Sequence, residues 1–193
     1  MGMAVTCQPH ATRRFTADEV WRMVEIGLLD PDEPYELINW ELLYVSPQNP
    51  PHAKVITRLN MALAAVYGPR DSVVRVKHPI GGIVDSIPEP DLAVVTLAVE
   101  EQERHPRADE TLLIVEVSDT SVARDVSKGG IYATAGAPLY WRVDVTRRVV
   151  VVHRGPVADG TWSDVAAVAI DETLDLPGIE GTLEVVRILA PPA

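Results

Sequence analysis

The chain has 193 residues, of which 47% are hydrophobic and 23% charged, and its formal net charge is −11 at pH 7. This length suits one domain with a single buried core, and the hydrophobic fraction argues against a largely disordered chain. The acidic balance counts against an avid, non-specific nucleic-acid binder, because Lys and Arg supply most of the affinity for phosphate. It does not exclude a nuclease, which needs only a local groove.

The cysteine content and the apolar segments indicate the cellular setting. The single cysteine, Cys7, excludes a disulfide within the chain and a Cys-based zinc site, which fits a reducing compartment. No apolar run reaches the roughly 18 residues of a membrane helix, and residues 1–14 lack the layout of a signal peptide. We expect a cytoplasmic protein that does not bind membranes, with those residues as a tail, one domain over 15–189 and a second tail over 190–193.

The first part of the chain predicts two helices around a pair of strands. Thr16 and Glu19 have the spacing of a capping box, so a helix is expected to begin there. Residues 35–46 predict two strands. Asn49 is placed to cap a second helix that ends at Gly68. The apolar residues along one side of that helix are Val55, Leu59, Leu63 and Val66.

Strand signals dominate the rest of the chain, and one helix interrupts them. This helix is expected over residues 121–135, with Gly136 as its stop. Its Gly129-Gly130 pair costs about 2 kcal/mol relative to alanines. The order of elements predicts a mixed α/β (α+β) domain. The expected strands cover residues 73–78, 90–95, 111–117, 139–145, 149–153, 162–169 and 183–188.

Glu116 is a carboxylate in a segment that otherwise looks like a buried strand. It follows four apolar residues, and burying a carboxylate is costly unless it is paired, hydrogen-bonded or bound to a metal. The alternative is that the strand ends at Glu116 and the side chain meets water. Asp91 begins another apolar strand 25 positions earlier. If the two strands are neighbours, both carboxylates can bind one hard cation, with the carbonyl of Val117 as a third ligand.

Lys128 lies 12 residues after Glu116, on the helix expected to follow the Glu116 strand. A helix there can return an ammonium group to the two carboxylates. That group could orient the attacking water or offset charge on a phosphorane-like transition state. The alternative for Lys128 is a solvated surface lysine, as most lysines are.

These residues form part of a longer pattern that resembles the Uma-type restriction endonuclease family of the PD-(D/E)XK nuclease superfamily. The resemblance runs from Phe15 to about Val185. Each matching segment is short, and the assignment rests on their order and spacing. The segments are YELI at 35–38, SP at 46–47 with His52, EPDLAVV at 89–95, VEVS at 115–118, Asp125, Lys128, Tyr132, AGAP at 135–138 and YWRVD at 140–144.

The resemblance implies a restriction-endonuclease-like core, a mixed central sheet flanked by helices, with the site at one sheet edge. Asp91 matches the PD aspartate and Glu116 matches the (D/E) position. Ser118 stands where the superfamily usually has lysine. Lys128 matches the lysine that this family carries on the following helix, and these residues form the expected catalytic set.

Three further residues are expected beside this set. Glu36 and His52 match polar positions of the family. The family usually turns its first hairpin with Asp-Gly, whereas this chain has Asn39-Trp40, and Trp does not favour the positive φ of a two-residue turn. If a two-residue loop nevertheless forms, Glu41 shares a strand face with Glu36.

The leading functional hypothesis is a metal-dependent endonuclease that uses Mg²⁺ or Mn²⁺ to hydrolyse nucleic acid. DNA is the expected substrate. Arg75 and Lys77, two apart on one strand, are candidate contacts to the nucleic-acid backbone, or else a solvated strand face. A homodimer is expected, because cutting two strands calls for two sites. The alternatives are a catalytically weak binding or assembly module that uses the strand over residues 149–152 as an edge, and a hydrolase of smaller phosphate esters.

Overall fold

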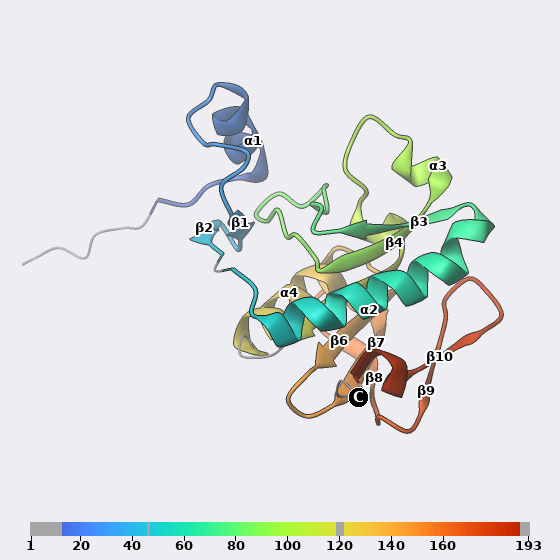
Figure 1. Ribbon diagram of the computed structural model, residues 1–193. Helices are drawn as coiled ribbons and strands as arrows, with labels where there is room; N and C mark the ends of the chain where they lie inside the picture. Colours follow the sequence, from blue (N-terminus) through green and yellow to red (C-terminus); the bar gives the residue numbers. More distant parts are fainter. Residues whose placement is uncertain (1–12, 46, 119–121, 190–193) are drawn as a thin grey trace, which may run out of the picture.

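The centre of the molecule is a six-stranded mixed sheet with strand order β3-β4-β5-β6-β7-β8 (Figure 1). The computed structural model describes residues 13–45, 47–118 and 122–189, without the side chains of 122–126. Strands β5 and β6 are parallel, and the other neighbours in the sheet are antiparallel. The strands are β3 (Ser72–Val76), β4 (Leu92–Thr96), β5 (Thr111–Ser118), β6 (Leu139–Asp144), β7 (Val149–Pro156) and β8 (Trp162–Val168).

Helices cover both faces of this sheet, as the expected fold class requires. Helix α4 (Val122–Thr134) makes the crossover between the parallel strands β5 and β6. Helix α2 (Pro50–Tyr67) runs across the opposite face, in front of the sheet in Figure 1. Alternate residues of β5 serve the two layers. Leu113, Val115 and Val117 belong to the core under α2, whereas Ile114 belongs to the core with Tyr132 of α4.

A smaller lobe at the N-terminal side holds α1 (Ala17–Glu25) and the hairpin of β1 (Tyr35–Ile38) and β2 (Glu41–Tyr44). Thr16 and Glu19 form both hydrogen bonds of the predicted capping box, so that prediction is confirmed. The hairpin keeps its two-residue loop, and Ile38 faces Glu41. Asn39 and Trp40 take φ values of 49° and 72° there, so the tryptophan accepts a left-handed conformation that its side chain disfavours.

Helix α2 is fixed at both ends. The side chain of Asn49 accepts a hydrogen bond from the backbone N–H of His52, as its predicted capping role requires. At the other end, the fully buried Tyr67 donates its hydroxyl proton to the carbonyl of Pro177, 2.8 Å away. A short 3₁₀ turn, η1 (Gly68–Arg70), then leads into β3.

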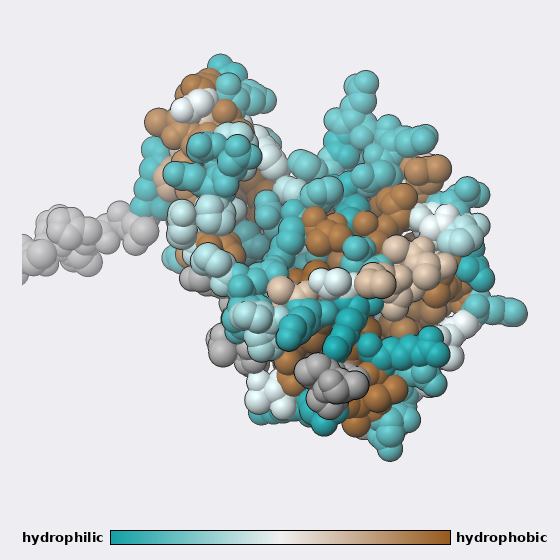
Figure 2. Space-filling model, viewed as in Figure 1, coloured by the Kyte–Doolittle hydropathy of each residue, from teal (hydrophilic) through white to brown (hydrophobic). Residues whose placement is uncertain are grey.

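The segment between β4 and β5 is a mostly polar connection on the surface. It contains α3 (Leu97–Glu100) and the 3₁₀ turn η2 (Ala108–Glu110). Figure 2 shows the turn that follows α3 as a hydrophilic projection at the top right. Ala108 of η2 is an exception, since it is buried in the core with Tyr132 of α4.

The strand predicted over residues 183–188 is wrong. A short strand β10 (Thr182–Glu184), paired with β9 (Thr173–Asp175), gives way to helix α5 (Val185–Leu189). The three residues that α5 buries follow a helical period. A short apolar segment of this kind can form either a strand or a helix, and here its packing against α2 favours the helix. The three buried residues are Val185, Ile188 and Leu189.

Two expectations about the sheet are also corrected. Strand β7 lies between β6 and β8, so residues 149–152 do not form the exposed edge on which the assembly alternative relied. Strand β3 ends at Val76, and Lys77 takes a left-handed φ of 53°. The predicted alternation therefore stops before Lys77, and Arg75 and Lys77 do not extend one regular strand face.

Candidate active site

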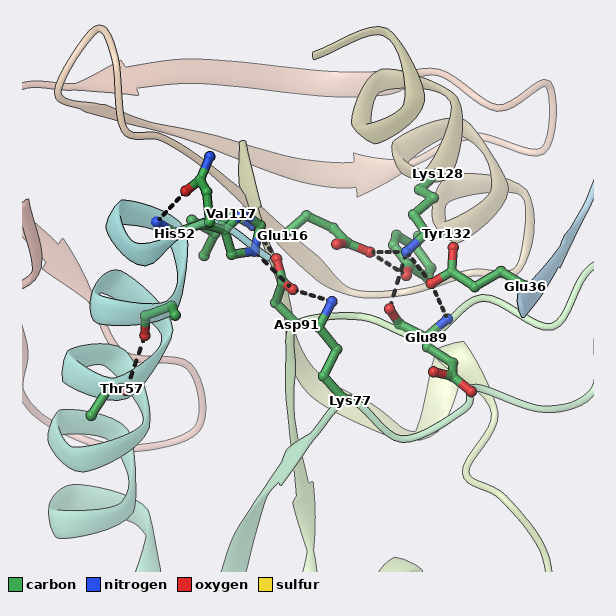
Figure 3. Close-up of polar contacts among 12 residues, drawn as sticks. Glu36, His52, Thr57, Lys77, Glu89, Asp91, Glu116, Val117, Lys128 and Tyr132 are labelled. Atoms are coloured by element: carbon green, nitrogen blue, oxygen red, sulfur yellow. Dashed lines mark hydrogen bonds and ion pairs between the residues drawn. The ribbon is translucent and has the colours of Figure 1, made fainter. Parts of the chain in front are cut away.

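Two buried carboxylates meet where β4 begins and β5 ends. Asp91 immediately precedes β4, and the pairing of Leu92 with Val115 in the antiparallel ladder places Asp91 beside Glu116 (Figure 3). Asp91 is 1% exposed and Glu116 is 2% exposed. Strand β5 continues to Ser118, so the alternative in which the strand ends at Glu116 and the carboxylate meets water is wrong.

Glu116 is held from the α4 side. Its Oε1 accepts a hydrogen bond from the hydroxyl of Tyr132 at 2.8 Å and lies 3.0 Å from Lys128 Nζ. Burial raises the pKa of Glu116 to about 7, because the loss of hydration outweighs the attraction of Lys128. Burial also raises the pKa of Tyr132, and the neighbouring Glu116 adds to that effect. Tyr132 therefore remains a hydrogen-bond donor.

Lys128 joins three acceptors. Its Nζ lies 2.8 Å from Glu36 Oε1, 3.0 Å from Glu116 Oε1 and 3.0 Å from the carbonyl oxygen of Glu89. Its side chain is 4% exposed, so the alternative of a solvated surface lysine is wrong. Burial alone would lower the pKa of Lys128, but the charges of Glu116 and Glu36 outweigh it and raise the pKa above its ordinary value.

Asp91 is held from the opposite side by different groups. Its Oδ2 accepts a hydrogen bond from the backbone N–H of Val117 at 2.7 Å. Its Oδ1 lies 2.5 Å from Lys77 Nζ and 3.3 Å from His52 Nε2. Burial alone would raise the pKa of Asp91, but the bond to His52 and the charge of Lys77 bring it below the ordinary value. Asp91 is therefore a carboxylate at neutral pH.

The two glycines of α4 let the helix approach the sheet closely enough for Lys128 to reach Glu36 and Glu116. A Cβ on Gly129 would lie 2.9 Å from Cε1 of Tyr140, which is too close for a real contact. Gly130 packs against the backbone of Gly160 in the β7–β8 turn. The helix-propensity cost expected for these glycines is therefore offset by close packing.

Of the other residues predicted around the site, Glu36 joins the cluster, whereas Glu41 and Arg75 do not. Glu36 is buried on β1, and its Oε1 also accepts a hydrogen bond from the backbone N–H of Glu89 at 3.3 Å. Glu41 is exposed at the turn of the hairpin. Arg75 is 9% exposed, and its guanidinium lies 2.5 Å from Glu100 Oε2, so it faces a protein carboxylate instead of an open groove. The side chain of Asp125 lies outside the described residues.

Three residues contact the charged cluster of the site although the sequence analysis did not predict these contacts. Lys77 was expected only to contact nucleic acid, yet it binds Asp91. Glu89 supplies its backbone carbonyl to Lys128, and the only sequence signal was its place two residues before Asp91. Tyr132 had a usable signal, because it lies four residues after Lys128 and residues four apart share one side of a helix.

A small cavity reaches this cluster from outside. It has a volume of about 230 Å³ and lies between the β1–β2 hairpin and the turn after β3. Its polar lining comes from Tyr35, Glu36, Gln48, Lys77 and Glu89. Lys77 and Glu36 thus connect the buried carboxylates to this opening.

The donor atoms fit a hard divalent cation on two carboxylates and one backbone oxygen. Within the described residues, no group of three or more His, Cys, Asp or Glu side chains is arranged to hold a metal ion. A Mg²⁺ ion needs fewer, since it keeps several waters and takes one or two carboxylates. The N–H and C=O of one strand residue face the same side, so the carbonyl of Val117 faces the side on which its N–H binds Asp91. Burial raises the pKa of Glu116, so a cation bound beside it would stabilise its charged form.

A mixed sheet flanked by helices, with two buried carboxylates at the ends of neighbouring strands, defines a restriction-endonuclease-like α/β protein. Residues 20–188 match the Uma2 family, described as "Putative restriction endonuclease", and the chain belongs to this family. A search of the curated proteins finds no match. Within the described residues, no helix is both long and apolar enough to cross a membrane.

A solved structure from Anabaena variabilis shares the fold. It is described as a "putative nuclease belonging to DUF820" and is 18% identical in sequence. The TM-score is 0.71, and the match covers 91% of this chain and 98% of that chain. The likeness thus extends over the whole fold and not only over the sheet.

Proposed function

We propose that this protein is a metal-dependent endonuclease that hydrolyses phosphodiester bonds of nucleic acid. DNA is the expected substrate, and Mg²⁺ or Mn²⁺ is the expected ion. The observation that carries the proposal is the convergence of Asp91 and Glu116, both fully buried, at the ends of adjacent strands. Membership of the Uma2 family and the fold shared with a protein described as a "putative nuclease" support it.

Asp91, Glu116 and the carbonyl of Val117 would hold the cation. When bound, such an ion activates a water and offsets charge on the phosphoryl oxygens. Hydrolysis adds water across one P–O bond and leaves a phosphomonoester on one side of the cut and a hydroxyl group on the other.

The chain's own groups prepare the two carboxylates. Lys128 fixes Glu116 and Glu36 relative to each other, because one ammonium group contacts both. Tyr132 makes the second contact to Glu116 Oε1 and thereby fixes the rotamer of Glu116. The backbone N–H of Val117 fixes Asp91, so neither carboxylate has to reorganise much when an ion binds.

The test is cleavage of single- and double-stranded DNA and RNA by the full chain, with Mg²⁺, with Mn²⁺ and with a chelator. Asp91→Asn and Glu116→Gln keep the side-chain size and remove the charge, and each is expected to lower the rate at least about 100-fold. Asp164→Asn is the matched control, because this carboxylate is 59% exposed on the edge strand β8. Cleavage that is equal in all four proteins would come from a contaminant and would refute the proposal.

A further inference from the structure

Lys128 has no proton left for a substrate. An ammonium group donates three hydrogen bonds, and the three acceptors around Lys128 are two carboxylates and the carbonyl of Glu89. The side chain is 4% exposed, so no phosphate can approach it without breaking one of these contacts. Lys128 is therefore a positioning residue, and any side-chain cation that contacts the substrate is a different one.

Lys77 has the opposite setting. Its side chain is 36% exposed, and it lines the 230 Å³ cavity that leads to the site. Its Nζ lies 2.5 Å from Oδ1 of Asp91, and this carboxylate is one of the groups proposed to hold the metal ion. Among the described residues that line this cavity, Lys77 is the only cationic side chain, whereas Glu36 and Glu89 are acidic.

Resting on the proposed nuclease function, we infer that Lys77 is an exchangeable counter-ion. It neutralises Asp91 while no metal ion is bound, yields Oδ1 to the ion, and then contacts the phosphate of the substrate in the cavity. A lysine and a divalent ion on one oxygen would repel each other at short range, so one must leave. Lys77 is the mobile partner, because its side chain is partly exposed while Asp91 is buried.

The backbone supports this exchange. The N–H of Lys77 donates to the carbonyl of Asp91 at 3.3 Å, and the left-handed φ of 53° turns the chain at that point. The lysine is thus anchored beside Asp91 whichever partner its ammonium group takes. Only the flexible four-carbon side chain has to move between the carboxylate and the cavity.

The first test is calorimetric titration of the protein with Mn²⁺ in the absence of nucleic acid. Lys77→Met removes the competing cation and is expected to bind Mn²⁺ about tenfold more tightly, equivalent to about 1.4 kcal/mol. Lys54→Met is the matched control, because Lys54 is exposed on α2, and its affinity should equal that of the wild type. Equal affinities in the wild type and Lys77→Met would overturn the inference alone. Absence of Mn²⁺ binding in every protein would overturn the proposed function with it.

The second test uses the wild type and so does not depend on how a variant folds. The chain has three lysines, Lys54, Lys77 and Lys128, so their rates of acylation by an amine-reactive reagent can be followed separately by mass spectrometry. Saturating Mg²⁺ is expected to raise the Lys77 rate several-fold and leave Lys54 unchanged. Dimethyl phosphate added with Mg²⁺ should lower the Lys77 rate again. A Lys77 rate that ignores Mg²⁺ overturns the exchange, and one that ignores dimethyl phosphate overturns the phosphate contact.

Discussion

The two carboxylates of the site are equally buried but are held in opposite ways. Glu116 lies behind Lys128 and Tyr132, and burial dominates, so its pKa rises to about 7. Asp91 lies beside Lys77 and His52, and these partners outweigh burial, so its pKa falls below the ordinary value. Burial alone therefore does not decide the charge of a buried acid; the number and placement of its cationic neighbours do. We call these the Glu116 side and the Asp91 side of the site.

The sharpest test of this contrast compares the two lysines. Lys128→Met leaves Glu116 and Glu36 buried without a counter-ion and is expected to lower the free energy of unfolding by about 3–5 kcal/mol. Lys77→Met should cost only about 1 kcal/mol, because this lysine is partly exposed and Asp91 keeps the N–H of Val117. Urea unfolding of both variants measures the difference. Equal losses would mean that the Asp91 side is as closed as the Glu116 side.

The next test is the pH dependence of stability. The pKa of Glu116 is raised from 4.5 to about 7, so its stabilising contribution is complete below pH 4.5 and is lost as pH rises through about 7. That loss is on the order of 3 kcal/mol. The pKa of Asp91 is lowered from 3.8, so its contribution is complete above pH 3.8 and is lost as pH falls below that value.

Glu116→Gln should therefore flatten the loss of stability between pH 4.5 and about 7, as measured by urea unfolding at several pH values. Asp91→Asn is the control, and it should retain most of that slope. A slope that persists in Glu116→Gln would show that another group titrates in this range.

The closeness of α4 to the sheet on the Glu116 side can be tested with its adjacent glycines. Gly129→Ala forces a Cβ against Tyr140 and is expected to cost about 1–3 kcal/mol. Gly130→Ala meets only the carbonyl oxygen of Gly160, at 3.4 Å, and should be neutral or gain up to about 1 kcal/mol from helix propensity. Thermal unfolding compares the two. If both alanines are tolerated equally, α4 has room to move away from the sheet.

The smallest expected effect is on the Asp91 side. His52→Asn removes the contact of 3.3 Å to Asp91 and should cost about 1 kcal/mol, because the other contacts of this carboxylate remain. Thr57→Ala changes an exposed position of the same helix and should stay within about 0.5 kcal/mol. A loss above that of Lys77→Met would make His52 the main partner of Asp91.

Much of the fold could be predicted because it rests on local signals. The capping pair Thr16 and Glu19, the Asn49 cap and the apolar run of β5 all act within a few residues of themselves. Glu116 could be predicted for the same reason, because it is a charged residue within the apolar strand β5. Its pairing with Asp91 followed once the two strands were taken as neighbours.

The parts that escaped prediction depend on partners far away in the sequence. Arg75 is buried because Glu100 lies 25 residues later, and Lys77 turns toward Asp91 because the chain leaves β3 there in a left-handed conformation. Residues 185–189 form a helix because they pack against α2. Their short apolar pattern fits a strand and a helix equally well. No pattern within either segment carries this information.

Helix α2 connects two distant parts of the molecule, because it makes a side-chain contact near each of its ends. Tyr67 is tied to Pro177 at one end, and His52 projects beside Asp91 from the first turn, fifteen residues or about 22 Å away along the axis. A tilt of roughly 5° about the tied end would sweep His52 through about 2 Å, enough to break its contact with Asp91. Small changes in the chain around Pro177, remote from every charged group of the site, would thus reach the contact between His52 and Asp91.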